Sequence, residues 1–363
     1  MICAVCLFSH CGKEYIDILV KYFGTEYKIC ASELFFVFLR VEFFIIMTIR
    51  NESPEMLVEQ IRRLKKEKRA VILAHYYVDG AIQDLADYVG DSLALAQKAA
   101  EAAGDANIVV MCGVHFMAET VKALCPDKKV LLPDMEAGCS LADSCPEDEF
   151  AAFVAAHPDH TVISYVNTPL DVKAHSDVLV TSGNAVKIVE SFPQDAKLIF
   201  GPDRNLGGYI NDLTGRQMLL WDGACHVHER FTPQSIIRLK EQYPDAPVLV
   251  HPECKRPVAL LADKVGSTAA LLDFAMKSPA KQFIVATESG ILHKMRQGAP
   301  EKEFFPVPPD NAACGCNDCA YMKLNTLTKL RDCLQNEAPE VIIDPQVAER
   351  ALRPIERMLE LSK

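Results

Sequence analysis

Three segments of the chain share one pattern of apolar and polar positions. Each opens with a run of aliphatic and β-branched residues that ends in a polar residue: AVILAH ends at His75, HTVISY at Tyr165 and APVLVH at His251. An Asp follows 12 residues after each end, and a hydroxyl residue follows 5 residues after the Asp. The Asp residues are Asp87, Asp177 and Asp263, and the hydroxyl residues are Ser92, Ser182 and Thr268. Spacing that is identical in three places indicates an internal repeat.

Each repeat continues in the same way beyond the hydroxyl residue. A helix-like stretch leads into a second apolar run, which reads ANIVVMCG, AKLIFGP or KQFIVATESG. A third short run leads into a loop with cysteine, in KKVLLPDMEAGC, RQMLLWDGAC and EKEFFPVPPDNAACGC. Continuous apolar runs are typical of parallel strands in sheets covered on both faces, and such strands are joined by right-handed crossovers. We therefore predict an α/β protein with three similar α/β/α domains, whose short parallel sheets surround a pseudo-threefold axis.

The same pattern gives the expected domain boundaries. Residues 1–46 show no clear periodicity, whereas a polar start, an amphipathic helix and a strand follow from Met47 onward. We expect residues 1–46 to be a non-native or disordered N-terminal extension; a genuine but poorly ordered arm is the alternative. The later parts are an N-terminal helix in 47–69, repeats in 70–157, 158–244 and 245–338, and a C-terminal helix in 339–363. In that helix Asp344 is the expected N-cap and Pro345 the first helical residue.

Composition and charge narrow the class of protein. Half of the residues are apolar and 24% are charged, as in ordinary globular proteins. The net charge is −11 and no basic run is sustained, so we expect no nucleic-acid partner. The apolar stretch ELFFVFLRVEFFIIM is interrupted by charges and shorter than a membrane span, and no secretion signal precedes it. We therefore expect a cytoplasmic protein without a membrane partner, in which the 14 cysteines serve metal binding or catalysis rather than disulfides.

Polar residues stand where the first strand of each repeat ends. They form pairs separated by one residue, and alternation along an extended chain places both side chains of a pair on the same side. The pairs are His75 with Tyr77, Tyr165 with Asn167, and His251 with Glu253. Because ligands gather at the carboxyl ends of parallel strands, these side chains are candidates for acid–base chemistry in one pocket. A lone histidine at a strand end is more often structural, but the threefold coincidence favours a site.

Two further features point to the same place. His228 lies three residues after Cys225, about one helical turn along, whereas we expect the adjacent His226 to point away. The segments GDSLALA, TSGNAVK and GSTAALL each lie between a strand and a helix, where a hydroxyl and free backbone N–H groups favour carboxylate or phosphate binding. Ordinary helix capping is the alternative for each segment taken alone.

The cysteine loops supply candidate metal ligands. One loop per repeat holds Cys139, Cys225 and the cluster Cys314, Cys316 and Cys319. A structural zinc site needs four ligands in a closed tetrahedron, whereas an iron–sulfur cluster with only three protein thiols keeps one iron open as a Lewis acid. Spacing alone leaves both possibilities open.

The residues described so far closely resemble quinolinate synthases of the NadA type, over 55–335. The matching stretches are AHYYVDGAIQDLADYVGDSLALA, LPDMEAGCSLADSCP, ISYVNTPLDVKAHSDVLVTSGNA, FGPDRNLGGYI, WDGACHVHERF, HPECKRPV and CNDCAYMKLNTL. The resemblance implies condensation of iminoaspartate with dihydroxyacetone phosphate to quinolinate, with release of phosphate and two waters, in NAD biosynthesis. It implies a [4Fe–4S] cluster held by one cysteine from each of three α/β/α domains, here Cys139, Cys225 and Cys319. An L-aspartate oxidase is a candidate partner.

The resemblance also implies roles for the other residues. The catalytic residues would be His75, Tyr77, Tyr165, His228 and Glu253. The substrate-binding residues would be His75, Ser92, Tyr165, Asn167, Ser182, His251, Glu253 and Thr268. The spacing C-x-C-x-x-C departs from the usual C-x-x-C and leaves open a reversible disulfide of Cys314 or Cys316. We expect Cys112, Cys125, Cys145, Cys254 and Cys333 to be core or peripheral thiols.

One alternative belongs to a different class of protein. Three hydroxyl loops for anions and a closed zinc site would also suit a zinc-stabilised binding protein for phosphorylated metabolites, without turnover. Three converging thiols favour the enzyme, because they leave an open metal position. Colour would distinguish the two, since a zinc protein is colourless and a [4Fe–4S] protein is brown.

Overall fold

The computed structural model describes residues 53–102, 106–309 and 317–363. The chain divides into compact parts between Pro54 and Glu55, and all three repeats lie in the second part. The predicted N-terminal extension and the thiols of Cys314 and Cys316 lie outside the described residues. Within the described ranges, no helix is both long and apolar enough to cross a membrane.

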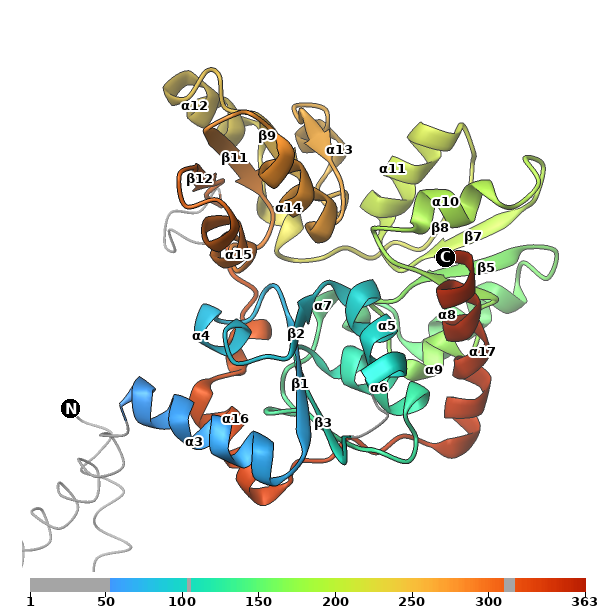
Figure 1. Ribbon diagram of the computed structural model, residues 1–363. Helices are drawn as coiled ribbons and strands as arrows, with labels where there is room; N and C mark the ends of the chain where they lie inside the picture. Colours follow the sequence, from blue (N-terminus) through green and yellow to red (C-terminus); the bar gives the residue numbers. More distant parts are fainter. Residues whose placement is uncertain (1–52, 103–105, 310–316) are drawn as a thin grey trace, which may run out of the picture. The chain divides into compact units, whose positions relative to one another are not determined.

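Three four-stranded sheets, one per repeat, form the framework (Figure 1). Every recorded pairing within these sheets is parallel. Their strand orders are β2-β1-β3-β4, β6-β5-β7-β8 and β10-β9-β11-β12, which is the same order three times. Helices connect the strands and flank each sheet. The prediction of three similar α/β/α domains is therefore confirmed.

The elements of the three repeats correspond closely. The first repeat consists of β1 (Ala70–His75), α4 (Gly80–Gln83), β2 (Tyr88–Gly90), α5 (Ser92–Ala102), β3 (Ile108–Cys112), α6 (His115–Leu124), β4 (Lys129–Leu131) and α7 (Ser140–Asp143). The second consists of α8 (Glu147–Ala155), β5 (Thr161–Tyr165), α9 (Leu170–Lys173), β6 (Val178–Val180), α10 (Ala185–Glu190), β7 (Leu198–Gly201), α11 (Arg204–Thr214), β8 (Leu219–Leu220) and the 3₁₀ helix η1 (His228–Arg230). The third consists of α12 (Pro233–Gln242), β9 (Val248–Val250), α13 (Arg256–Ala259), β10 (Lys264–Val265), α14 (Thr268–Lys277), β11 (Gln282–Ala286), α15 (Ile291–Gly298), β12 (Glu303–Pro306) and η2 (Met322–Leu324). The predicted boundaries at 157/158 and 244/245 differ from this grouping, because they place α8 in the first repeat and α12 in the second.

The repeated Asp has one structural role in all three repeats. Its carboxylate accepts a hydrogen bond from a backbone N–H of the first strand, at Ile72, Val162 or Val248, over 2.7–2.8 Å. Its own backbone N–H donates to the carbonyl of that same strand residue over 2.9 Å in each repeat. The two bonds fix the connection that leads into the second strand, which explains why the spacing is constant.

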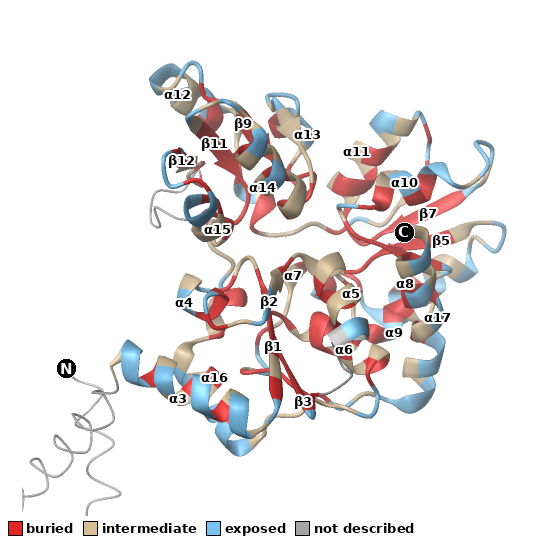
Figure 2. Cartoon of the chain, in the orientation of Figure 1, coloured by how far each residue is buried: buried red, intermediate tan, exposed pale blue. Residues whose placement is uncertain are grey.

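Both faces of the third sheet are buried (Figure 2). Along β11, Phe283 and Val285 pack into one apolar cluster, whereas Ile284 and Ala286 pack into another. Side chains that alternate between two buried faces require an unbroken apolar run, as the sequence shows. The second sheet alternates in the same way, since Ile163 and Phe200 join a large cluster shared with the first sheet whereas Val162 and Ile199 join another.

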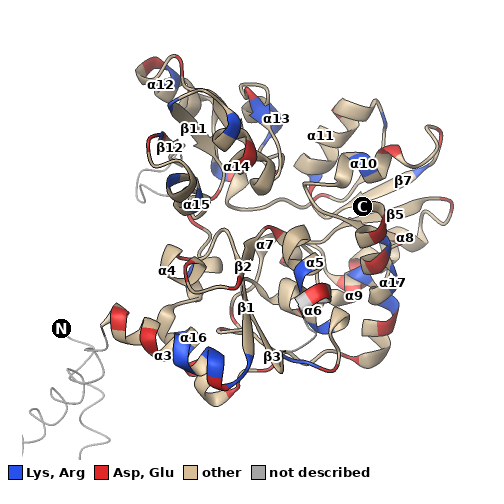
Figure 3. Ribbon diagram, in the orientation of Figure 1, with Lys and Arg blue, Asp and Glu red and all other residues tan. Residues whose placement is uncertain are grey.

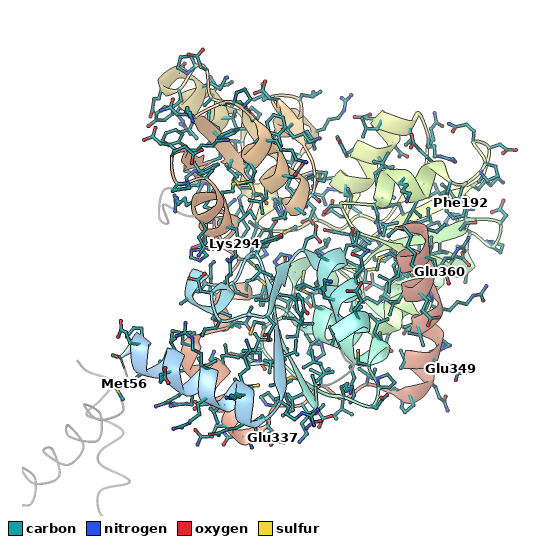
Figure 4. The ribbon with its side chains drawn as sticks, viewed as in Figure 1. Met56, Phe192, Lys294, Glu337, Glu349 and Glu360 are labelled. Atoms are coloured by element: carbon teal, nitrogen blue, oxygen red, sulfur yellow. The ribbon has the colours of Figure 1, made fainter. Side chains whose placement is uncertain are left out.

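Three helices outside the repeats complete the fold: α3 (Pro54–Glu67), α16 (Leu327–Asn336) and α17 (Pro345–Leu361). Helix α17 packs against α6, α9 and β6, so it ties the first repeat to the second. Its N-cap is Asp344, which accepts hydrogen bonds from the backbone N–H groups of Gln346 and Val347, as predicted. Glu349 and Glu360 lie on the exposed side of this helix (Figure 4).

Charged residues of both signs are scattered over the helices in the view of Figure 3. No basic stretch dominates that view, in keeping with the net charge of −11. The distribution agrees with the prediction that the protein does not bind nucleic acid, although it does not test that prediction.

Candidate active site

One cavity receives side chains from all three repeats. Every site residue predicted from the sequence lines it: His75, Tyr77, Ser92, Cys139, Tyr165, Asn167, Ser182, Cys225, His228, His251, Glu253, Thr268 and Cys319. They come from the ends of first strands, the segments before helices, and the cysteine loops. The fold therefore brings together residues that lie far apart in the sequence.

His75 and His251 occupy equivalent positions at the ends of β1 and β9. In each, Nδ1 accepts a hydrogen bond from the backbone N–H two residues later, Tyr77 at 3.2 Å and Glu253 at 3.3 Å. An Nδ1 that accepts leaves the proton of a neutral ring on Nε2. Each ring is therefore set to offer one N–H donor to a ligand.

Burial keeps both rings neutral. It lowers the pKa of His75 to about 3, and it does the same for His251. Desolvation disfavours the charged imidazolium and lowers the pKa of each ring. The negative charge of Glu253 raises both pKa values, but by less than desolvation lowers them. Neutral donors suit the recognition of carboxylate or phosphate oxygens without a proton transfer.

Glu253 is the acidic centre of the cavity. Its carboxylate accepts a hydrogen bond from the Tyr165 hydroxyl over 2.5 Å, and its other oxygen lies 2.9 Å from His228 Nδ1. Burial by itself raises the pKa of Glu253, but the neighbouring His228 and His251 and the hydrogen bond from Tyr165 outweigh it and lower this pKa to about 2. Glu253 is thus ionised at neutral pH.

Thr287 is a member of the site that the sequence analysis missed. Its hydroxyl lies 2.9 Å from the Tyr77 hydroxyl and 3.0 Å from His228 Nε2. Tyr77 also contacts the Thr268 hydroxyl over 2.8 Å. A chain of hydrogen-bonding groups therefore runs from Glu253 through His228 and Thr287 to Tyr77. Thr287 directly follows β11, so the rule that ligand groups gather at strand ends could have identified it.

Helix capping does not occupy the hydroxyl groups of Ser92 and Thr268. Asp91 and Ser267, which precede the predicted hydroxyls, cap α5 and α14 by accepting from Ala94 and Ala270 backbone N–H groups. The side chains of Ser92 and Thr268 are thereby left to the cavity. In the second repeat, α10 begins only at Ala185, so Ser182 precedes the helix rather than starting it. The prediction of a helix N-terminus at Ser182 is wrong in that detail.

The cavity wall also contains a polar atom without a hydrogen-bond partner. Asn167 Oδ1 is buried and has no hydrogen-bond partner among the described residues. Buried amide oxygens are nearly always paired, because leaving one unpaired costs free energy. Since Asn167 lines the cavity, a bound molecule with a donor would satisfy it.

Three thiols complete the cavity wall. Cys139 is the N-cap of α7, Cys225 follows β8, and Cys319 precedes η2. All three are free thiols. Cys139 contributes to raising the pKa of Cys225, and Cys319 contributes to raising the pKa of Cys139. The other described thiols, Cys112, Cys125, Cys145, Cys254 and Cys333, are buried and do not line this cavity, as predicted.

The environment of the thiols fits a cationic metal group. Burial raises the pKa of Cys139 to about 12, and it also raises the pKa values of Cys225 and Cys319. The protein alone therefore keeps them protonated, whereas a coordinated metal deprotonates such thiols outright. Three soft sulfur donors from three loops, with oxygen and nitrogen donors around them, suit iron–sulfur chemistry.

A second set of donor atoms lies beside the thiols. Cys225, His228 and Glu253 have ligand atoms within 4.8 Å of one another, close enough to hold a single ion. His228 and Glu253 already engage each other, Thr287 and Tyr165. The three thiols are therefore more available to bind a metal than His228 and Glu253.

The cavity also contains side chains that were not expected there. His226 lines it and lies with Nδ1 2.6 Å from the Ser140 hydroxyl, so the expectation that it points away is wrong. Tyr321 contacts the His226 ring edge-on. Glu288 is fully buried in the wall, and burial raises its pKa to about 7 against the opposing charge of Lys323.

Comparison with known proteins identifies the family. The family model described as "Quinolinate synthetase A protein" matches residues 59–360. The chain belongs to this family. Among curated proteins, the quinolinate synthase of Synechococcus sp. is 55% identical over 312 residues, 86% of this chain and 97% of that protein. The quinolinate synthases of Synechocystis sp. and Chloroherpeton thalassium are 55% and 54% identical over 309 and 313 residues, 85% and 86% of this chain and 96% and 97% of those proteins.

Membership of the quinolinate synthetase A family makes this chain an enzyme of that type. The matched residues, 59–360, include all three sheets and every residue of the cavity. The resemblance inferred from the sequence motifs is therefore confirmed, and a binding protein without turnover is set aside.

Proposed function

We propose that this protein condenses iminoaspartate with dihydroxyacetone phosphate to quinolinate, releasing phosphate and two waters, as a step of NAD biosynthesis. The observation that carries the proposal is the meeting of three thiols, one from each repeat, with acid–base and anion-binding side chains in one cavity. The reaction balances without an external oxidant or reductant. The thiols would accordingly hold a group that serves as an acid rather than an electron carrier.

We propose that Cys139, Cys225 and Cys319 hold a [4Fe–4S] cluster. When bound through three protein thiols, such a cluster supplies one Lewis-acidic iron without a protein ligand. The meeting of three free thiols, one from each repeat, in the wall of one cavity supports the proposal, because soft sulfur donors suit iron–sulfur clusters.

The chain's own residues would bind the two substrates. Ser92, Ser182 and Thr268 would donate hydroxyls to carboxylate and phosphate oxygens, and the neutral rings of His75 and His251 would donate Nε2–H. The unpaired Oδ1 of Asn167 would accept a hydrogen bond from substrate. All of these residues line the cavity, and the distribution over three repeats suits two substrates that must meet.

The chain of neighbouring polar groups from Glu253 to Tyr77 would move protons, with an ion-pair contact as its first link and hydrogen bonds beyond His228. Ionised Glu253 holds Tyr165 and orients His228, whose other nitrogen reaches Thr287 and through it Tyr77. A proton taken from substrate at one end of this chain can be returned to a departing hydroxyl at the other, which dehydration requires. We propose this proton role for Tyr77, Tyr165, His228 and Glu253.

The proposal extends to the location of the protein and to the source of one substrate. The described cysteines are all unpaired, which supports a cytoplasmic location, since reducing compartments keep thiols free. Oxidation of aspartate yields iminoaspartate, so we propose an L-aspartate oxidase as the supplier.

The proposed function is tested by assaying the anaerobically purified full chain with both substrates. We expect quinolinate and inorganic phosphate in equal amounts, and no quinolinate when dihydroxyacetone phosphate is omitted. The Cys225→Ala variant should form none, while Cys333→Ala, which changes a buried thiol away from the cavity, should match the wild type. Wild-type protein that carries metal yet forms neither product would contradict the proposal.

A further inference from the structure

Glu288 and Lys323 form an ion pair at the cavity wall. Glu288 follows β11 by two residues and its side chain is 0% exposed. Lys323 belongs to η2, four residues after Cys319, and its Nζ lies 3.3 Å from Glu288 Oε1. A buried carboxylate is retained only where charges and hydrogen bonds compensate for lost hydration. The partners of this one therefore indicate what it does.

The Glu288 carboxylate binds two backbone N–H groups. Oε2 accepts from Gly290 over 2.7 Å, and Oε1 accepts from Cys319 over 3.2 Å. The first bond is local, whereas the second reaches 31 residues along the chain to one of the three cavity thiols. Glu288 thus fastens the backbone of Cys319 to the end of the third sheet.

Lys323 links the same loop to the first repeat. Its Nζ donates to the Tyr77 carbonyl over 2.8 Å, and its backbone N–H donates to the Cys319 carbonyl over 3.1 Å. The Cys319 residue is therefore held at its N–H by Glu288 and at its C=O by the turn that carries Lys323. Through the ion pair, the thiol's position is connected with that of Tyr77.

The backbone around Gly290 packs closely against the end of β1 and against Glu288. A Cβ on Gly290 would lie 2.7 Å from both the Tyr76 carbonyl oxygen and the Tyr77 Cα, and 2.8 Å from Glu288 Oε2. Only glycine allows the third repeat to approach the end of β1 this closely. The carboxylate is consequently fixed against a rigid backbone surface, as a positioning group needs to be.

We propose that Glu288, neutralised by Lys323, is a positioning residue that sets the place of the Cys319 thiol among the three thiols of the cavity. The inference rests on the proposed function in so far as the thiols serve a cluster, but the positioning itself is a property of the chain. Without Glu288, Cys319 would still belong to the loop, yet its backbone N–H would lose a charged acceptor.

The test compares Glu288→Gln with wild type and with the control Glu340→Gln. Glutamine has nearly the same size but only one acceptor oxygen and no charge. Glu340 pairs with Lys122 over the same distance, 3.3 Å, and does not line the cavity. Brief alkylation of the reduced, metal-free full chain by iodoacetamide, followed by mass spectrometry, gives the labelling rate of each thiol separately.

We expect Glu288→Gln to raise the labelling rate of Cys319 about tenfold, the effect of losing a hydrogen bond to a charged group. Cys139 and Cys225 should keep their wild-type rates, and Glu340→Gln should change none of the three. An unchanged Cys319 rate would overturn the proposal. An equal rise at all three thiols would also overturn it, because that result means general loosening of the fold.

A second variant and a second readout guard against misfolding. Lys323→Met removes the cation and the link to Tyr77, and it should likewise accelerate labelling at Cys319 alone. In anaerobically purified protein, both variants should release iron to a chelator faster than wild type. If the wild type holds no iron and sulfide, the proposed function fails, while the labelling rates still decide the role of Glu288.

Discussion

At the scale of single residues, the site is governed by what each polar group can pair with. The strand-end pairs were predictable because alternation fixes the direction of neighbouring side chains. Thr287 and Glu288 were not found, because the sequence analysis considered the end of the first strand of each repeat and these two residues follow a later strand, β11. In the second repeat the buried Asp203, two residues after β7, occupies the place equivalent to Glu288. Repetition of the first-strand ends guided the sequence analysis, so polar residues that follow the later strands escaped it.

Thr287 tests the proton path. Thr287→Val keeps the shape of the side chain but removes the hydroxyl that bridges Tyr77 and His228. We expect kcat for quinolinate formation to fall about 100-fold, as for loss of a positioned acid–base group. Thr120→Val is the matched control, since Thr120 is equally buried and donates only to a backbone carbonyl within α6. Full kcat in Thr287→Val would exclude the path.

Lys173 gives a prediction about pH and stability. Its ammonium is fully buried and donates to the carbonyls of Thr168 and Phe116, over 2.5 Å and 3.4 Å, and burial lowers its pKa to about 8. Since the unfolded chain holds this proton up to its ordinary pKa near 10.5, folding gains relative stability as pH rises from about 8 to 10.5. Lys173→Met lacks the effect.

The comparison is made by chemical denaturation at both ends of that pH range. The stability of wild type minus that of Lys173→Met should increase by about 3 kcal/mol between pH 8 and 10.5, at 1.36 kcal/mol per pKa unit. The exposed Lys187→Met variant should show no such change relative to wild type. Parallel pH profiles for wild type and Lys173→Met would show that the ammonium is not penalised by burial.

At the scale of elements, the strands and long helices could be predicted from their sequence patterns, whereas the short helices could not. The start of α17 was predictable because Asp344 and Pro345 form a known start signal. The four-residue helices α4, α9 and α13, which follow the first strand of each repeat, are too short to show a helical period. The late start of α10 has a local cause: Asn184 Oδ1 accepts from the Thr181 N–H and stabilises a turn there instead.

The repeated Asp tests what holds the strands in place. Asp177→Ala removes the acceptor for the Val162 N–H, so we expect the free energy of unfolding to fall by about 1–2 kcal/mol. Asp177→Asn, which retains one acceptor oxygen, should lose less than half of that amount. Asp195→Ala, an exposed change in the same repeat, should be neutral. Equal stability of the Ala and Asn variants would rule out the hydrogen bond as the reason for the spacing.

At the scale of the molecule, threefold repetition explains why one site can draw on the whole chain. Each repeat delivers a strand end, a hydroxyl segment and a cysteine loop, and the fold gathers all of them at one cavity. The sequence predicted this convergence because identical spacing from strand end to Asp to hydroxyl residue places these residues at equivalent positions in three equivalent sheets. Spacing alone could not predict which donors would hold a metal, since that depends on contacts such as those of His228 and Glu253 across repeats.

The most direct test of the account is the content of iron, acid-labile sulfide and zinc in protein purified without oxygen. We predict about four irons and four sulfides per chain in the wild type and in Cys333→Ala. Both should be lost in Cys139→Ala, Cys225→Ala and Cys319→Ala, because each removes one of three thiols. Stoichiometric zinc without sulfide, or a full cluster in any of these three variants, would contradict a cluster held by one thiol from each repeat.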